Sequence, residues 1–186
     1  MIILDIETTG TDANKNGMLS LGAVHYETGE TFYGECHLTE GREIHPIALE
    51  INGFTLEQIH NKSLPSDGKL LMNFIIAFSH LKDNLIGGHN VGHLDLLFIE
   101  EIFGRDKRIS TKFPFSYRTV DLHSLAYQKF GESLSHEQIC KRLGLEPEQK
   151  PHNALKGALS ERDAFKILLQ KSTGYSQEEI DEYSMK

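Results

Sequence analysis

The order of β-prone and amphipathic segments constrains the fold of this chain more than any other feature of its sequence. Strand-like runs at residues 2–7, 18–26 and 30–38 come first, and Glu27-Thr28-Gly29-Glu30 between the last two is typical of a hairpin turn. Beyond them, strand-like and helical segments alternate. Hairpin strands followed by this alternation predict a mixed β-sheet covered by helices, which is an α/β layered domain.

The remaining elements are predicted from apolar periodicity and from capping residues. An irregular segment around Pro46 precedes Thr55, which has the capping-box spacing to Gln58 at the start of a short helix. We expect a tail or a final helix at about 172–186, within one domain that spans residues 1–186. The other expected helices are 66–82, 92–103, 122–130, 135–142 and 153–170, and the other expected strands are 84–88 and 118–121.

Composition excludes several classes of protein. The chain has 186 residues, the size of one domain, and no apolar run approaches the roughly 20 residues that a membrane span needs. The N-terminus has no basic segment before a long apolar one, so we expect a cytoplasmic protein without a secretory signal. Cys36 and Cys140 have no neighbours at metal-ligand spacing and are expected to be buried thiols in a reducing compartment.

The net charge of −8 argues against a protein that holds nucleic acid through a broad basic surface. Affinity of that kind comes from Lys and Arg side chains that neutralise phosphates. The charge is compatible with an enzyme that meets phosphates through bound cations, because a cluster of acids awaiting cations adds negative charge to the formal count.

The first apolar run carries two acids, Asp5 and Glu7. Strand side chains alternate, so both acids point to one side while Leu4 and Ile6 point to the other. Two carboxylates on one face of an apolar strand repel each other and lose hydration, which a bound cation would relieve. An edge strand with a solvated face explains the same spacing equally well.

Two later segments also combine polar residues with helix starts. In the first, His89-Asn90 is followed by Asp95 in the first turn of an expected helix, where the helix dipole favours a carboxylate. In the second, His152 stands just before Asn153, which is an expected cap of the last long helix. Taken alone, each is better explained as an ordinary helix terminus than as a functional site.

Together the three segments resemble the DEDDh superfamily of 3′–5′ exonucleases, which includes polymerase proofreading subunits, RNase T and the three-prime repair exonucleases. The matching segments, in order, are Asp5-Ile6-Glu7-Thr8-Thr9-Gly10, then His89-Asn90 with Asp95, then His152-Asn153-Ala154-Leu155. The resemblance implies a ribonuclease H-like mixed β-sheet flanked by helices on both faces. It also implies hydrolysis of phosphodiester bonds at 3′ ends, with release of nucleoside 5′-monophosphates.

The resemblance further implies a mechanism with two divalent cations, Mg²⁺ or Mn²⁺. Asp5, Glu7, Asp95 and a fourth acid would hold them, since hard cations prefer oxygen ligands. The catalytic residues would be Glu7 and His152. Of the two, His152 would take a proton from the metal-bound water. Histidine suits this role because its ordinary pKa lies near neutrality.

Other residues are expected near the 3′-terminal nucleotide. The backbone of Thr8, Thr9 and Gly10 is a candidate for contact with the terminal sugar. Phe54 stands where family members often wedge an apolar side chain against the terminal bases, although a core position explains it equally well. We expect Asp121 to be a helix cap rather than a metal ligand.

One position departs from the family pattern. The fourth acid, an Asp in the family, is expected five residues after His152, and this chain has Gly157 there. One hypothesis is that Glu161 substitutes: it falls on the buried stripe of the helix, opposite Asp163, and can reach back over Gly157 toward the missing carboxylate. The other hypothesis is a disabled site, in a slow nuclease or in a module that binds 3′ ends without cutting.

The sequence leaves several functional alternatives open. A metal-dependent phosphatase or cyclic-nucleotide hydrolase is a further rival, since one fold hosts many chemistries. The expected partners are 3′ ends of single-stranded DNA or RNA, with no membrane partner and with the choice between the two polymers undecided. A homodimer and a polymerase-type partner are both compatible with the sequence.

Overall fold

The computed structural model describes residues 1–81, 84–106, 109 and 114–170. Within these residues no helix combines the length and the apolar character needed to cross a membrane. The described strands are β1 (Ile2–Thr8), β2 (Met18–His25), β3 (Thr31–Glu35), β4 (Ile86–Gly88) and β5 (Thr119–Asp121). The described helices are α1 (Pro46–Asn52), α2 (Leu56–Ile59), α3 (Asp67–Phe78), α4 (Asp95–Arg105), α5 (Leu122–Phe130), α6 (His136–Leu143) and α7 (Ala154–Leu168).

The strands form one mixed sheet in the order β3-β2-β1-β4-β5. The first three pair antiparallel, as the predicted hairpin requires, and β4 and β5 extend the sheet parallel to β1. This arrangement confirms the predicted mixed sheet and places β1 at its centre.

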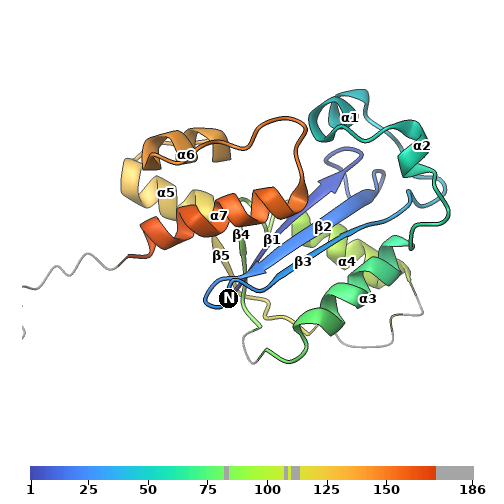
Figure 1. Ribbon diagram of the computed structural model, residues 1–186, viewed down its shortest axis with the longest axis horizontal. Coiled ribbons are helices and arrows are strands. Elements are labelled where there is room, and N and C mark those ends of the chain that lie inside the picture. The colour runs from blue at the N-terminus through green and yellow to red at the C-terminus, as the bar shows by residue number, and fades with distance from the viewer. Residues whose placement is uncertain (82–83, 107–108, 110–113, 171–186) are drawn as a thin grey trace, which may run out of the picture.

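Helices cover both faces of the sheet (Figure 1). The side chains of β1 alternate between the two faces. Ile2, Leu4 and Ile6 pack with buried residues of α3 and α4 on one face. Ile3 packs with buried residues of α5, α6 and α7 on the other. Because side chains alternate along a strand, the two acids of β1 share the α7 face with Ile3.

A glycine of β2 allows α7 to approach the sheet closely. Gly22 pairs with Asp5 across the antiparallel ladder. A Cβ atom on Gly22 would lie 2.2 Å from the backbone carbon of Ala154 and from the nitrogen of Leu155. The first turn of α7 therefore rests directly on backbone next to Asp5.

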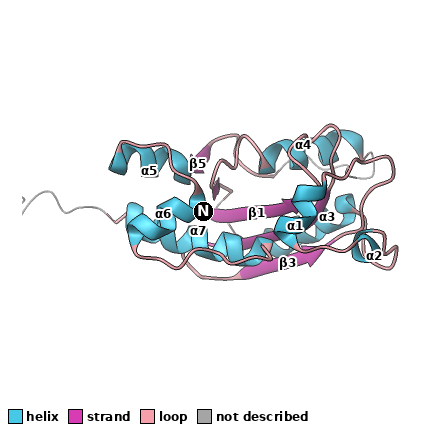
Figure 2. Ribbon diagram, turned by 90° about the horizontal axis from the view of Figure 1, so that it is seen from above, coloured by secondary structure: helices cyan, strands magenta, loops and turns pink. Residues whose placement is uncertain are grey.

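Most predicted elements are confirmed, including the capping box at Thr55 and the helix cap at Asp121. The prediction of an irregular segment around Pro46 was wrong, because residues 46–52 form α1 (Figure 2). Proline at the first helical position lacks only an N–H that has no partner within the helix, so it is compatible with a helix start. Helix α4 begins at Asp95, three residues later than predicted. Cys36 and Cys140 are buried, and the predicted tail at 172–186 lies outside the described residues.

A carboxylate-lined candidate active site

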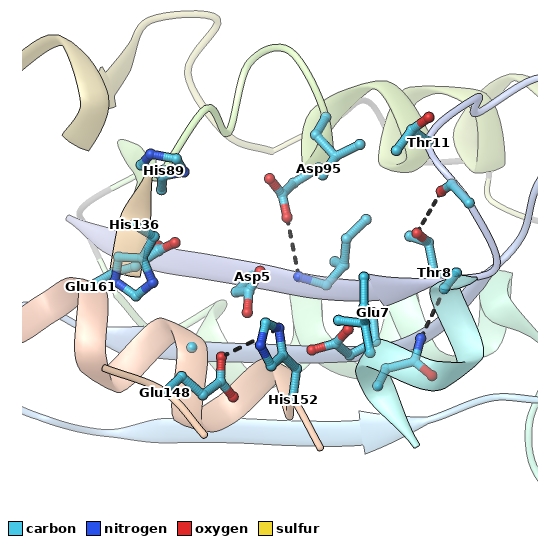
Figure 3. A pocket seen from close by; sticks show the side chains of 17 residues that line it. Asp5, Glu7, Thr8, Thr11, His89, Asp95, His136, Glu148, His152 and Glu161 are labelled. Atoms are coloured by element: carbon cyan, nitrogen blue, oxygen red, sulfur yellow. Dashed lines mark hydrogen bonds and ion pairs between the residues drawn. The ribbon is translucent and has the colours of Figure 1, made fainter. Parts of the chain in front are cut away.

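A cavity of about 310 Å³ is lined by the carboxyl-terminal half of β1 together with residues of α1 and α7, and Figure 3 shows the side chains around it. Pockets of roughly 300–1,000 Å³ are typical of small-ligand sites, so the cavity is large enough for a small ligand. Its ionisable lining comes from five separate parts of the chain: Asp5, Glu7, His89, Asp95, His136, Glu148, His152 and Glu161.

Both acids of β1 line this cavity on the side that is formed by the sheet. The side chain of Glu7 is 8% exposed, and that of Asp5 is partly exposed toward the cavity. The prediction that Asp5 and Glu7 share one face is confirmed, and the alternative of a solvated edge strand is wrong because β1 is the central strand.

Asp95 meets β1 from the first turn of α4. Its Oδ1 accepts a hydrogen bond of 3.1 Å from the backbone N–H of Ile6, and the residue is 3% exposed. The predicted position in the first helical turn is confirmed. The hydrogen bond brings a residue 89 positions distant in sequence next to Asp5 and Glu7.

The position of the expected fourth acid is filled by a side chain from β1. A Cβ atom on Gly157 would lie 1.9 Å from Oδ2 of Asp5 and 2.9 Å from its Cγ. The expectation that Gly157 leaves room for Glu161 was therefore wrong, because the Asp5 carboxylate takes that room. The helix packs too closely on the sheet for any side chain at 157 while Asp5 keeps this rotamer.

Glu161 nevertheless lies in the same cavity, one turn further along α7. It is 5% exposed, whereas Asp163 is on the exposed side of the helix, as predicted. The backbone N–H of His89 donates toward its carboxylate. Its Oε2 is buried and has no hydrogen-bond partner among the described residues. A buried oxygen without a partner is costly unless a ligand satisfies it.

Burial and mutual repulsion shift the pKa values of these acids upward. Desolvation is the first cause at Asp5, followed by the charge of Glu161, and the pKa rises well above its usual range. Desolvation and then the charge of Glu148 raise the pKa of Glu7 to about 8. Desolvation raises the pKa of Asp95 to about 7, although the backbone N–H groups that donate to its carboxylate lower the pKa. Burial likewise raises the pKa of Glu161, with the charge of Asp95 next in importance.

This donor set fits hard divalent cations. Carboxylate oxygens are the ligands that Mg²⁺ and Mn²⁺ prefer, and Glu161, which lines the same cavity, has a buried Oε2 without a hydrogen-bond partner among the described residues. No three His, Cys, Asp or Glu side chains of the described residues are arranged as a ready-made metal site.

His152 stands at the mouth of the cavity, and a glutamate that sequence reasoning missed stands beside it. The Nδ1 of His152 lies 3.9 Å from Oε2 of Glu148, and Glu148 also accepts from the backbone N–H of Asn153 at 2.7 Å. Glu148 lies in the loop between α6 and α7. No periodicity in a loop indicates where a side chain points, so the sequence carried no signal for Glu148.

Two further histidines line the cavity. His89 lines the cavity, and its buried Nε2 has no hydrogen-bond partner among the described residues. His136, which was not predicted, begins α6 and lies 5.8 Å from His89 between ring centroids. Burial, with the charges of His89 and His152 next, lowers the pKa of His136 to about 4, so its ring is neutral at pH 7.

Only some of the residues predicted to contact the terminal nucleotide line the cavity. Thr8 and Gly10 line the cavity. Thr9 does not: it is fully buried, and its hydroxyl bonds to the backbone of Glu43 and Gly17. Phe54 lines a neighbouring cavity of about 210 Å³, which shares Asn52 and His152 with the first, and packs on an apolar cluster.

Comparisons with known proteins identify the family of this chain. A family model described as exonuclease matches residues 2–160. DNA polymerase III PolC-type from Thermotoga maritima is 29% identical over 160 residues, which are 84% of this chain and 11% of that protein. The protein of the same name from Thermotoga petrophila matches with the same identity and coverage. The chain thus spans about a tenth of the length of these curated relatives.

Solved structures of Exonuclease I from E. coli share the fold. The complex with a 5cy-dT13 oligonucleotide gives a TM-score of 0.72 at 19% identity, over 99% of this chain and 42% of that one. The complex with a dT13 oligonucleotide gives a TM-score of 0.71 at 18% identity, over 99% of this chain and 43% of that one. This likeness confirms the predicted ribonuclease H-like sheet flanked by helices. Because the family match extends over most of the sequence and includes every predicted motif, this chain belongs to the exonuclease family, as its resemblance to the DEDDh-type 3′–5′ exonucleases predicted.

Proposed function

We propose that this protein hydrolyses phosphodiester bonds at nucleic-acid 3′ ends with two divalent cations, Mg²⁺ or Mn²⁺, and releases nucleoside 5′-monophosphates. One observation carries the proposal: Glu161 on α7 faces the acids of β1 with a buried oxygen that lacks a partner among the described residues. A buried carboxylate beside Asp5 is unfavourable in a purely structural role. It is favourable if it shares cations with Asp5.

In this mechanism Asp5, Glu7, Asp95 and Glu161 would hold the cations. When bound, two cations would neutralise the acids and stabilise charge on both the attacking and the leaving oxygens of the phosphoryl centre. The raised pKa values of the acids support this assignment, since a cation would relieve the repulsion that raises them.

The proton chemistry falls to His152. Its ring is 37% exposed at the mouth of the cavity, where it can accept a proton from the attacking water. His89 and His136 are more buried, and their pKa values are lowered, first by desolvation, so they are poorer proton acceptors at neutral pH. Glu7, next to this path, would orient the water.

The substrate side of the proposal is a single-stranded 3′ end. Among the residues that line the cavity besides its ionisable groups are Thr8 and Gly10 near the end of β1 and Ala48 and Ile51 in α1. Polar backbone and small apolar side chains suit a sugar and a base without selecting the base. Exonuclease I has been solved with single-stranded DNA oligonucleotides, which supports this substrate class by analogy. A polymerase-type partner is suggested in the same way by the PolC-type relatives.

The test is degradation of single-stranded DNA and RNA oligomers labelled at either end, with Mg²⁺, Mn²⁺ or a chelator. We expect cation-dependent release of 5′-mononucleotides from the 3′ end, and the ratio of DNA to RNA turnover identifies the substrate. Asp5→Asn and Glu161→Gln should each lower kcat by at least about 100-fold, as loss of a cation ligand does. Asp163→Asn, on the exposed side of the same helix, is the matched control and should leave kcat unchanged.

The alternative is a module that binds 3′ ends with weak or no turnover. The absence of an acid at Gly157 is the observation that favours it. Tight binding of 3′-ended oligomers, without release of nucleotides in any cation, would establish this alternative. Activity that survives Glu161→Gln would remove Glu161 from the ligand set while leaving the exonuclease assignment in place.

A further inference from the structure

We propose that Glu148 is a positioning residue for His152: its carboxylate keeps the imidazole proton on Nδ1 and leaves Nε2 free to accept a proton. The catalytic consequence rests on the proposed function. The pairing itself is a property of the folded protein and can be measured without substrate.

The carboxylate of Glu148 is fixed by the start of α7. One oxygen accepts the backbone N–H of Asn153 at 2.7 Å, and Asn153 caps α7 through hydrogen bonds to the N–H groups of Leu155 and Lys156. The side chain of Glu148 is only 10% exposed. A buried carboxylate held by a helix cap has little freedom to turn, so its second oxygen keeps a constant direction.

That second oxygen faces the ring of His152. Oε2 of Glu148 and Nδ1 of His152 are 3.9 Å apart, which is an ion-pair distance and not yet a hydrogen bond. The backbone of His152 is held independently, because its N–H donates to the carbonyl of Ile51 in α1 at 3.0 Å. Rotation of the ring can shorten the distance between Nδ1 and Oε2, and catalytic contacts of this kind commonly tighten when substrate binds.

The chemistry requires one tautomer. A neutral imidazole accepts a proton at one nitrogen only if the other nitrogen carries the hydrogen. A carboxylate at Nδ1 favours the hydrogen there and stabilises the imidazolium that forms after proton transfer. Glu148 therefore has the placement that makes Nε2 of His152 the basic nitrogen.

Within the described part of the chain, no other ion pair is found at His152. Glu137 on α6 is exposed and is bound to Lys141 at 2.5 Å, and Lys141 lowers the pKa of Glu137 more than the charge of His152 does. His136 on the same helix is neutral at pH 7. Glu7 on β1 belongs to the proposed cation ligands. Its pKa is raised first by desolvation and then by the negative charge of Glu148.

Glu148→Gln is the informative substitution because it retains the shape of the side chain. The amide oxygen can still accept from the N–H of Asn153, which turns the NH₂ group toward Nδ1 of His152. The amide would then donate to Nδ1 and move the ring proton to Nε2. We expect ¹⁵N NMR of the cation-free protein to report mainly the Nδ1–H tautomer of His152 in the wild type and mainly the Nε2–H tautomer in Glu148→Gln.

The kinetic expectation is a loss in kcat of roughly 100-fold with KM changed less than about twofold, within the range that general-base catalysis contributes. Glu146→Gln removes the same charge from an exposed position in the same loop and should change neither the tautomer nor kcat. Calorimetry with Mn²⁺ alone should give equal affinity for the wild type and for Glu148→Gln.

Two results would overturn the inference. An unchanged tautomer in Glu148→Gln would show that Glu148 does not determine which ring nitrogen of His152 carries the proton. A fall in Mn²⁺ affinity as large as that of Glu161→Gln would make Glu148 a cation ligand instead. If the wild type releases no nucleotide, the proposed function fails, whereas the NMR comparison still decides the pairing of Glu148 with His152.

Discussion

The carboxylate of Asp5 occupies the position where a side chain of residue 157 would begin, 1.9 Å from a Cβ atom placed on Gly157. The central strand and α7 thus meet at a point where only glycine is compatible with this Asp5 rotamer. The proposed loss of one family acid and its replacement by Glu161 are therefore linked to the direction of Asp5.

Gly157→Ala should separate function from stability. The added methyl group forces the Asp5 carboxylate to rotate, so we expect Mn²⁺ affinity and kcat to fall by at least about tenfold. Alanine is favoured over glycine within a helix by about 1 kcal/mol. The melting temperature should therefore change little although Mn²⁺ affinity and kcat fall. Calorimetry and thermal melting check the two effects. Gly104→Ala is the control, since a Cβ atom there meets nothing within 4 Å, and unchanged Mn²⁺ affinity in Gly157→Ala would contradict the argument.

The cation-free protein should lose stability as pH rises from about 5 to 8. Folding raises the pKa of Glu7 to about 8 and that of Asp95 to about 7, above the ordinary values of about 4. The folded state therefore binds more protons than the unfolded state in this window, and the free energy of unfolding decreases by the order of a few kcal/mol. Urea titrations at several pH values measure it. Saturating Mg²⁺ or Mn²⁺ should flatten the decrease, and an equal slope with and without cation would contradict cation binding by these acids.

Asp95→Asn and Asp95→Ala should differ in stability but not in activity. Asparagine retains an oxygen for the N–H of Ile6, whereas alanine leaves that buried donor without its 3.1 Å acceptor. An unsatisfied buried donor costs about 1–3 kcal/mol, so only Asp95→Ala should show this loss in urea denaturation. Both substitutions remove the carboxylate and should reduce nucleotide release alike. Full activity in Asp95→Asn would exclude the residue as a cation ligand.

Arg42 should be important for stability although it lies outside the cavity. Its guanidinium is bound to Glu101 of α4 and donates to the carbonyls of Ala13 and Asn14 at 3.0 and 2.9 Å, with the side chain 9% exposed. Removal of one member of a buried ion pair costs roughly 3–5 kcal/mol, so Arg42→Met should lower the free energy of unfolding by that order.

The control for Arg42 is the exposed ion pair between Arg142 and Glu132, whose side chains are 48% and 55% exposed. Arg142→Met should change stability by less than about 1 kcal/mol, because solvent screens exposed pairs. Equal effects of the two substitutions in chemical denaturation would mean that the buried ion pair of Arg42 contributes no more to stability than an exposed ion pair does.

Local sequence patterns were sufficient for most of the fold. The capping box at Thr55, the asparagine cap at Asn153 and the side-chain alternation of β1 depend on neighbours within a few residues. The helix at residues 46–52 replaces the irregular segment that was predicted around Pro46, because the first helical position tolerates proline.

The sequence by itself determined the face of β1 that carries Asp5 and Glu7, the place of Asp95 at a helix start, and the burial of Glu161, because each follows from the period of a strand or a helix. The tertiary structure alone decided that Asp5 fills the space over Gly157, that Thr9 turns away from the cavity, and that Glu148 meets His152. Those three facts depend on how closely α7 approaches the sheet and on the path of a loop. Distances between segments remote in sequence are set by packing, on which local periodicity carries no information.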